Sequence, residues 1–139
     1  MALKGRLLAI DYGEKNIGLA CSDELGLTVR PLPSIHNRGR KELLKTLRDT
    51  IHQMDIRGLV IGMPFNMDGS QGDSAFRIEQ FMDTLKSAIR VPLVSIDERL
   101  STMEALELWR GMNPRQQKKY RTADSLAAAI ILERYLKEN

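Results

Sequence analysis

Residues 6–21, RLLAIDYGEKNIGLAC, are the part of the chain that says most about its topology. The first six form a nearly continuous apolar run that ends in the acid Asp11, which is typical of a central strand buried on both faces. The following residues, YGEKN, supply turn chemistry, and residues 17–21 predict a second strand. We therefore expect a β-hairpin with Asp11 at the end of its first strand.

Outward from this hairpin, strand and helix patterns alternate. Short apolar runs predict further strands near 27–29, over 59–61 and over 93–96. The first of these should stop at Arg30-Pro31, because a residue before proline is conformationally restricted. Apolar side chains at helical spacing predict helices over 41–54, 74–89, 101–109 and 122–136. In the second helix we expect Phe76 to face inward, and Ser101 and Thr122 are candidate N-caps of the last two.

This order of elements predicts an α/β fold. An antiparallel start followed by β-α-β alternation is best satisfied by a mixed five-stranded sheet flanked by helices, with the later strands parallel. The length of 139 residues fits a single domain, 1–139. The lone cysteine, Cys21, and the absence of any apolar stretch long enough for a membrane span lead us to expect a soluble, cytoplasmic protein with no membrane partner.

Positive charge is concentrated in one segment. Residues 110–121 hold five basic residues and no acid, whereas the rest of the chain has 16 basic and 18 acidic residues. Such a local basic patch predicts a polyanionic partner, because phosphate contacts release counterions. A solvated loop is the alternative for so short a segment.

Three acids occupy places where chemistry is plausible: Asp11, Glu98 after the last strand, and Asp124 in the first turn of the final helix. Strand ends and a helix N-terminus can converge on one edge of such a sheet. Three clustered carboxylates repel one another unless a cation compensates, and Mg²⁺ or Mn²⁺ suits oxygen ligands. Two such ions can hydrolyse a phosphodiester. Each acid also has a structural explanation: a turn before Gly13, a strand end paired with Arg99, and a favourable acid at a helix start.

Other motifs are less decisive. Gly13 and Gly18 place two positions without side chains beside Asp11, where a metal-bound phosphate could approach the backbone or a tight hairpin could form. The loop over 62–70 follows a strand, and its Asn66 is a candidate substrate contact. No zinc-ligand spacing, GxSxG motif or P-loop is present in the sequence.

Five strings, LLAIDYGEKNIGLA, RPLPSI, VIGMPFNMDGS, SIDERLSTMEA and ADSLAAAIILERYL, together resemble the YqgF family, also called RuvX. The resemblance covers nearly the whole chain. It implies a ribonuclease H-like fold related to the RuvC-type nucleases. Members of the family are linked to maturation of the 5′ end of 16S ribosomal RNA, and some are described as Holliday junction resolvases.

The resemblance also implies roles for residues. Asp11, Glu98 and Asp124 would be the catalytic metal ligands, holding one or two Mg²⁺ or Mn²⁺ ions, whereas Asp97 should point to the opposite face from Glu98. Lys119 and Arg121 stand where family members carry a lysine run. The residues expected to contact nucleic acid are Arg115, Lys118, Lys119, Arg121, Asn66 and Arg99.

We accordingly expect a metal-dependent endonuclease that processes the 5′ end of pre-16S rRNA, with structured RNA and a ribosomal precursor particle as partners. A resolvase of four-way DNA junctions is the first alternative, and it favours a homodimer over a monomer because resolution needs two matched cuts. A non-catalytic nucleic-acid-binding factor in ribosome assembly is the second. A sugar-kinase or actin-type ATPase also carries Asp-x-Gly before a hairpin, but the chain is too short for its two lobes.

Overall fold

The computed structural model describes residues 3–63, 73–97, 107, 109–120 and 123–138. One mixed sheet has the strand order β3-β2-β1-β4-β5. Its strands are β1 (Leu7–Asp11), β2 (Asn16–Ser22), β3 (Val29–His36), β4 (Gly58–Met63) and β5 (Leu93–Asp97). The first three are antiparallel, and β1, β4 and β5 are parallel to one another, which confirms the predicted mixed sheet.

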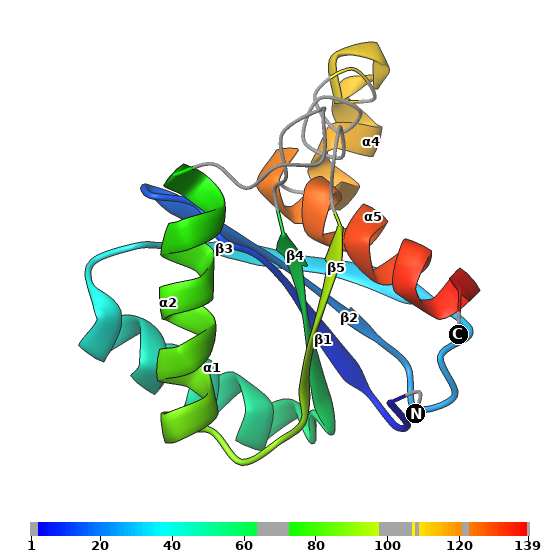
Figure 1. Ribbon diagram of the computed structural model, residues 1–139. Coiled ribbons are helices and arrows are strands. Elements are labelled where there is room, and N and C mark those ends of the chain that lie inside the picture. Colours follow the sequence, from blue (N-terminus) through cyan, green and yellow to red (C-terminus); the bar gives the residue numbers. More distant parts are fainter. Residues whose placement is uncertain (1–2, 64–72, 98–106, 108, 121–122, 139) are drawn as a thin grey trace.

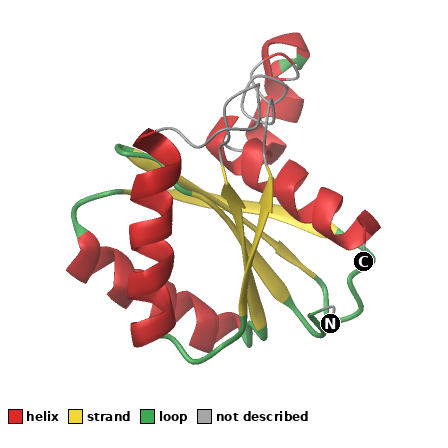
Figure 2. Cartoon of the chain, in the orientation of Figure 1, coloured by secondary structure: helices red, strands yellow, loops and turns green. Residues whose placement is uncertain are grey.

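Helices cover both faces of this sheet (Figures 1 and 2). They are α1 (Arg40–Met54), α2 (Asp73–Ala88), α4 (Pro114–Tyr120) and α5 (Ala123–Glu138). Alternation along β1 explains the two layers. Leu8 and Ile10 pack with α1 and α2 in one cluster, whereas Leu7 and Ala9 pack with α5 in the other. Every residue of β1 is therefore buried, as the apolar run predicts.

The third strand and the second helix differ from the sequence-based expectation. β3 continues through Pro31 and Pro33 to His36, whereas we expected it to stop at Arg30-Pro31. β3 is an edge strand and pairs with one neighbour only. Proline, which has no backbone N–H to donate, is tolerated in such a strand. Phe76 was expected to face inward, and it is 60% exposed. It precedes the buried Ile78 by two residues, about 200° around the helix, so the two point to different sides.

For the basic segment and the last two predicted helices, the structure tests only some of the expectations from the sequence. Residues 114–120 form α4, so the segment is not a simple solvated loop. The final helix is confirmed as α5. The expected helix over 101–109 falls largely outside the described residues, as do its candidate cap Ser101 and the candidate cap Thr122.

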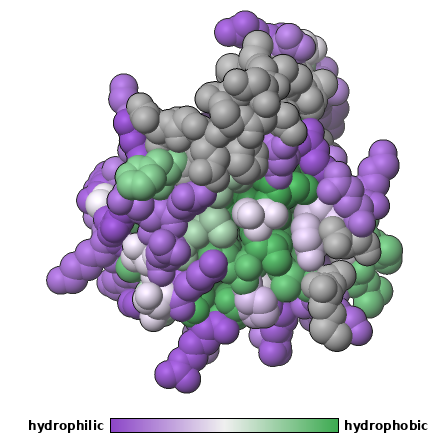
Figure 3. Space-filling view, in the orientation of Figure 1, coloured by the Kyte–Doolittle hydropathy of each residue, from purple (hydrophilic) through white to green (hydrophobic). Residues whose placement is uncertain are grey.

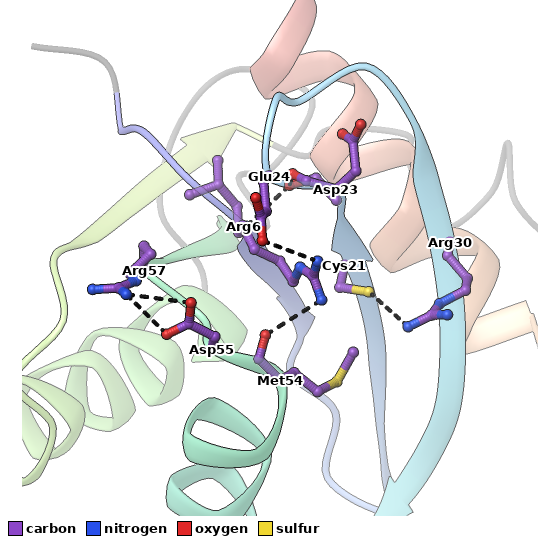
Figure 4. Close-up of polar contacts among 10 residues, drawn as sticks. Arg6, Cys21, Asp23, Glu24, Arg30, Met54, Asp55 and Arg57 are labelled. Atoms are coloured by element: carbon purple, nitrogen blue, oxygen red, sulfur yellow. Dashed lines mark hydrogen bonds and ion pairs between the residues drawn. The ribbon is translucent and has the colours of Figure 1, made fainter.

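Polar contacts tie the chain together at the end of the sheet where β1 begins (Figure 4). Arg6 donates to the carbonyl oxygen of Met54 at 3.4 Å and lies 3.9 Å from the Glu24 carboxylate. Arg30 reaches the buried thiol of Cys21 at 3.8 Å. Within the described part of the chain, no helix has both the length and the apolar character that crossing a membrane requires.

Candidate active-site edge

The carboxyl ends of three parallel strands lie at one edge of the sheet, the usual place for a ligand site in open α/β sheets. Asp11 ends β1, Met63 ends β4 and Asp97 ends β5. The strands are in register there, because Ile10 pairs with Ile61 and Met63 with Asp97. Figure 1 shows the start of α5 beside this edge.

Gly18 relates the position of Asp11 to that of Asp124 at this edge. In the β1–β2 ladder Asp11 pairs with Gly18. A Cβ built on Gly18 would overlap the backbone carbonyl of Asp124 and lie 3.0 Å from the backbone nitrogen of Ser125. The first turn of α5 therefore rests directly on β2 at the level of Asp11, and only glycine at position 18 allows this approach.

A buried hydroxyl holds the same turn of α5 against the next strand. Ser125 is fully buried, and its Oγ donates to the backbone carbonyl of Leu32 in β3 at 2.5 Å. The hydrogen bond satisfies a polar group that would otherwise be costly to bury. The start of α5 is thus positioned by two strands, and Asp124 with it.

The environment of the two carboxylates is partly desolvated. Asp11 belongs to the same alternation as Leu7 and Ala9, which face α5, and it is only 9% exposed. Asp124 is half-buried, and burial raises its pKa. Burial disfavours the charged form unless a cation or hydrogen bonds compensate, and the amino end of α5 supplies part of that compensation through its dipole.

The last residue of β5, Asp97, lies on the side of the sheet that faces away from α5. Val94 and Ile96 pack in the α5 layer, so alternation assigns Asp97 to the opposite side of the sheet. Arg134 of α5 donates to the backbone carbonyl of Asp97 at 2.9 Å, which ties α5 to the end of β5. Glu98, expected as the third ligand, lies outside the described residues.

The turn after Asp11 is braced from three sides. The Tyr12 ring stacks on Phe81 of α2, with centroids 4.3 Å apart. Asn37 donates to the carbonyl oxygen of Gly13 at 3.0 Å, and Glu14 forms an ion pair with Arg77. A Cβ on Gly13 would overlap the carbonyl of Asn16. The space beside both glycines is therefore filled by the protein itself. The Asn16 carbonyl of the same turn lies against Gly13, and the first turn of α5 lies against Gly18.

The basic segment is organised as a capped helix, which our sequence analysis did not foresee. Asn113 Oδ1 accepts from the backbone N–H of Gln116 at 2.9 Å, and Gln116 Oε1 accepts from that of Asn113 at 3.1 Å. This is a capping box, with Pro114 at the first helical position. The string NPRQ was the signal available in the sequence. Arg115 and Lys118, three residues apart on α4, are both exposed.

The side chains of the other residues expected to contact nucleic acid are not described. Asn66, Arg99 and Arg121 lie outside the described residues, and the side chain of Lys119 is not described. Asn37 and Ser125 were missed because each acts through the backbone of a distant element and belongs to no chemical motif.

The donor set at the edge suits a hard divalent cation. Asp11 and Asp124 offer carboxylate oxygens, the ligand type preferred by Mg²⁺ and Mn²⁺. Two carboxylates alone do not form a three-residue metal site, and none is found among the residues that the structure describes. The residues present fit such an ion provided that a third ligand comes from outside them.

Comparison with known proteins identifies the family. A family model described as RuvX, Holliday junction resolvase, matches residues 5–138. The chain belongs to the RuvX family. Its relatives in this family include proteins named "Putative pre-16S rRNA nuclease" from Halothermothrix orenii, 36% identical over 94% of both chains, and from Lactobacillus acidophilus, 38% identical over 94% of this chain and 95% of the relative.

Solved structures support the fold expected of a RuvX protein. RuvC of T. thermophilus, solved in complex with a Holliday junction substrate, matches with a TM-score of 0.57 at 14% identity, covering 96% of this chain and 95% of RuvC. The Fowlpox virus resolvase in complex with Holliday junction DNA matches with a TM-score of 0.58 at 12% identity, covering 96% and 97%. At such identities the likeness establishes the ribonuclease H-like fold alone.

Proposed function

We propose that this RuvX-family protein is a metal-dependent endonuclease that hydrolyses phosphodiester bonds during 5′-end processing of pre-16S rRNA. The observation that carries the proposal is the contact between Gly18 and Asp124, which brings the first turn of α5 to the level of Asp11. The name "Putative pre-16S rRNA nuclease" that both relatives cited above carry favours this substrate.

In this proposal Asp11, Asp124 and Glu98 are the catalytic residues and together hold one or two Mg²⁺ or Mn²⁺ ions. When bound, such ions supply Lewis-acid stabilisation of the charge that develops on the scissile phosphate and on the leaving oxygen. Asp11 is fixed by its place in β1, and Asp124 by the anchoring of α5 on β2 and β3. These contacts set the backbone positions of Asp11 and Asp124 before substrate arrives, as preorganised catalysis requires.

Basic side chains then hold the substrate beside the carboxylates. Arg115 and Lys118 are exposed on α4, which packs against α5, so they lie close in the fold to the helix that carries Asp124. We assign them to the phosphate backbone, whose contacts position a nucleic acid without reading its sequence. The further contacts proposed for the nucleic acid are Lys119, Arg121, Arg99 and Asn66.

Resolution of four-way DNA junctions is the second candidate function. The description of the matching family model as a Holliday junction resolvase favours it. Two matched cuts require two sites, so this function predicts a symmetric dimer on the junction. A factor that binds nucleic acid without cutting it remains the third candidate.

One experiment separates these functions. A labelled pre-16S 5′-leader RNA and a labelled four-way DNA junction are incubated with the protein in Mg²⁺ or Mn²⁺. The variants are Asp11→Asn and, as a matched control, Asp83→Asn, which removes an exposed carboxylate from α2. RNA cleavage that Asp11→Asn abolishes and Asp83→Asn retains supports the proposal.

The remaining outcomes are equally distinct. Paired symmetric cuts in the junction, without RNA cleavage, would replace the ribonuclease with a resolvase. Binding of either substrate without cleavage in both metals would favour the non-catalytic factor. Full cleavage by Asp11→Asn would refute the assignment of the catalytic edge.

A further inference from the structure

A second basic surface lies on α1, in the layer opposite α5. Its exposed basic side chains, here called the α1 basic face, are Arg38, which precedes the helix, and Arg40, Lys41, Lys45 and Arg48 on the helix. They line an open depression of about 680 Å³ together with Gly39 and one acid, Glu42. In Figure 3 hydrophilic residues predominate on this α1 and α2 side of the molecule, with a few paler or green residues among them.

The five basic side chains of this face outnumber the two acids of α1, Glu42 and Asp49, and form no ion pair within the described part of the chain. The ion pairs found there join Arg6 to Glu24, Arg57 to Asp55 and Arg77 to Glu14, and none involves the α1 basic face. Such an excess of exposed cations over acids creates a positive potential that attracts anions.

The arrangement of these side chains suits an extended anion. Lys41, Lys45 and Arg48 follow one another at i, i+4 and i+7, so they form a stripe along one side of α1, about 10 Å long at the helical rise per residue. Arg40 hydrogen-bonds Thr84 Oγ1 at 3.3 Å, and Arg48 hydrogen-bonds the carbonyl of Ala88 at 3.4 Å. Two of the five are thereby held against α2, which lowers the entropy cost of using them.

The chemistry of the face favours a nucleic acid over a lipid surface. Laid along the axis of a duplex, where each strand carries one phosphate per about 3.4 Å, a stripe of about 10 Å spans roughly three phosphates of one strand. A helix that binds a bilayer needs large apolar side chains beside its cations. The large apolar residues exposed among the described residues are Leu25, Leu27 and Phe76, and none of them belongs to α1.

We propose that the α1 basic face binds the phosphate backbone of the same nucleic acid that is cut at the candidate edge, at a distance from the scissile bond. The inference rests on the proposed function. In Figure 1 α1 lies at the lower left beside α2, whereas α4 lies at the top near the start of α5, so the two basic surfaces are on different parts of the molecule. A substrate long or branched enough to contact both is held by more phosphates than the edge alone provides.

The test compares two double variants that each remove two positive charges. Lys41→Gln/Lys45→Gln alters the α1 basic face, and Lys86→Gln/Lys137→Gln removes exposed lysines from the last turns of α2 and α5. Binding of a labelled pre-16S 5′-leader RNA and a four-way DNA junction is measured by fluorescence anisotropy across a salt series, without divalent metal. Thermal unfolding verifies that both variants keep the wild-type stability.

We expect the α1 variant to lower the slope of log Kd against log salt by about 1.8 and to raise Kd roughly tenfold or more at 0.1 M salt, because two phosphate contacts are lost. Its cleavage rate at saturating substrate should equal that of the wild type. The control variant should bind as the wild type does.

Equal binding by the two variants would overturn the inference and leave the proposed function standing. If the wild type binds neither probe, the proposed function itself fails. Anionic phospholipid vesicles provide a third arm. If the α1 variant loses only its binding to the vesicles, the face belongs to a membrane and the nucleic-acid assignment is wrong.

Discussion

The backbone carbonyl of Asp124 occupies the position that a side chain on Gly18 would need. Gly18 in turn is the ladder partner of Asp11. The carboxylate of the first strand and the carboxylate that opens the last helix are therefore brought to one edge by a contact that contains no functional side chain. The geometry of the candidate site depends on how closely a helix and a strand pack.

Gly18→Ala tests this dependence. The added methyl group must displace the start of α5, and overpacking of this kind costs about 1–3 kcal/mol. We expect a lower free energy of unfolding in urea and reduced metal-dependent cleavage, because Asp124 moves with α5. Gly111→Ala is the matched control. Position 111 is helical and has open space around it, so alanine there should be neutral or stabilising by about 0.4–1 kcal/mol. Wild-type stability and cleavage in Gly18→Ala would contradict the packing argument.

Asp124 should make stability depend on pH in the direction opposite to that of a salt-bridged acid. Burial raises its pKa above the ordinary value of 3.8. Between pH 3.8 and the raised pKa of Asp124, the folded protein binds more protons than the unfolded chain. The free energy of unfolding therefore falls as pH rises through that window. In EDTA, Asp124→Asn should therefore be more stable than the wild type at pH 7, with a gap that shrinks below pH 3.8. The measurement is urea unfolding at both pH values, and a less stable variant at pH 7 would contradict the desolvation argument.

Divalent cations should stabilise the folded protein through the same carboxylates. A ligand that binds only the folded state contributes about 2.7 kcal/mol at a hundredfold excess over its Kd. We expect Mn²⁺ or Mg²⁺ to raise Tm of the wild type and to leave Tm of Asp11→Asn nearly unchanged. Ca²⁺ and Zn²⁺ provide the comparison for hard and softer cations. An equal shift in the wild type and in Asp11→Asn would place the ion elsewhere.

The capping box of α4 should matter for nucleic-acid binding. Asn113→Ala removes the acceptor for the Gln116 N–H, and loss of such a cap costs about 1 kcal/mol of helix stability. We expect faster hydrogen exchange in α4 and weaker binding of nucleic acid, because Arg115 and Lys118 lose their fixed spacing. Asn113→Asp keeps an oxygen acceptor and should behave as the wild type in exchange. If Asn113→Ala binds as tightly as the wild type, the order of α4 does not contribute to binding.

Much of the fold was predictable because its signals are local. The apolar run that ends at Asp11 and the helical spacing of α1, α2 and α5 reflect burial, and burial imposes its period on neighbouring residues. Where the environment is not local, the expectation failed. β3 passes through Pro31 because it lies at an edge, and Phe76 is exposed because Ile78 and Phe81 set the buried side of α2.

The sequence by itself determined the α/β class, the hairpin around Asp11, and the three acids as candidates. The tertiary structure decided what brings Asp11 and Asp124 to one edge. No spacing in the chain relates these residues, because their proximity arises from the pairing of β1 with β2 and from the packing of α5 on Gly18 and Leu32. Such contacts depend on the shape of two distant surfaces, and residue patterns along a single strand or helix do not record that shape.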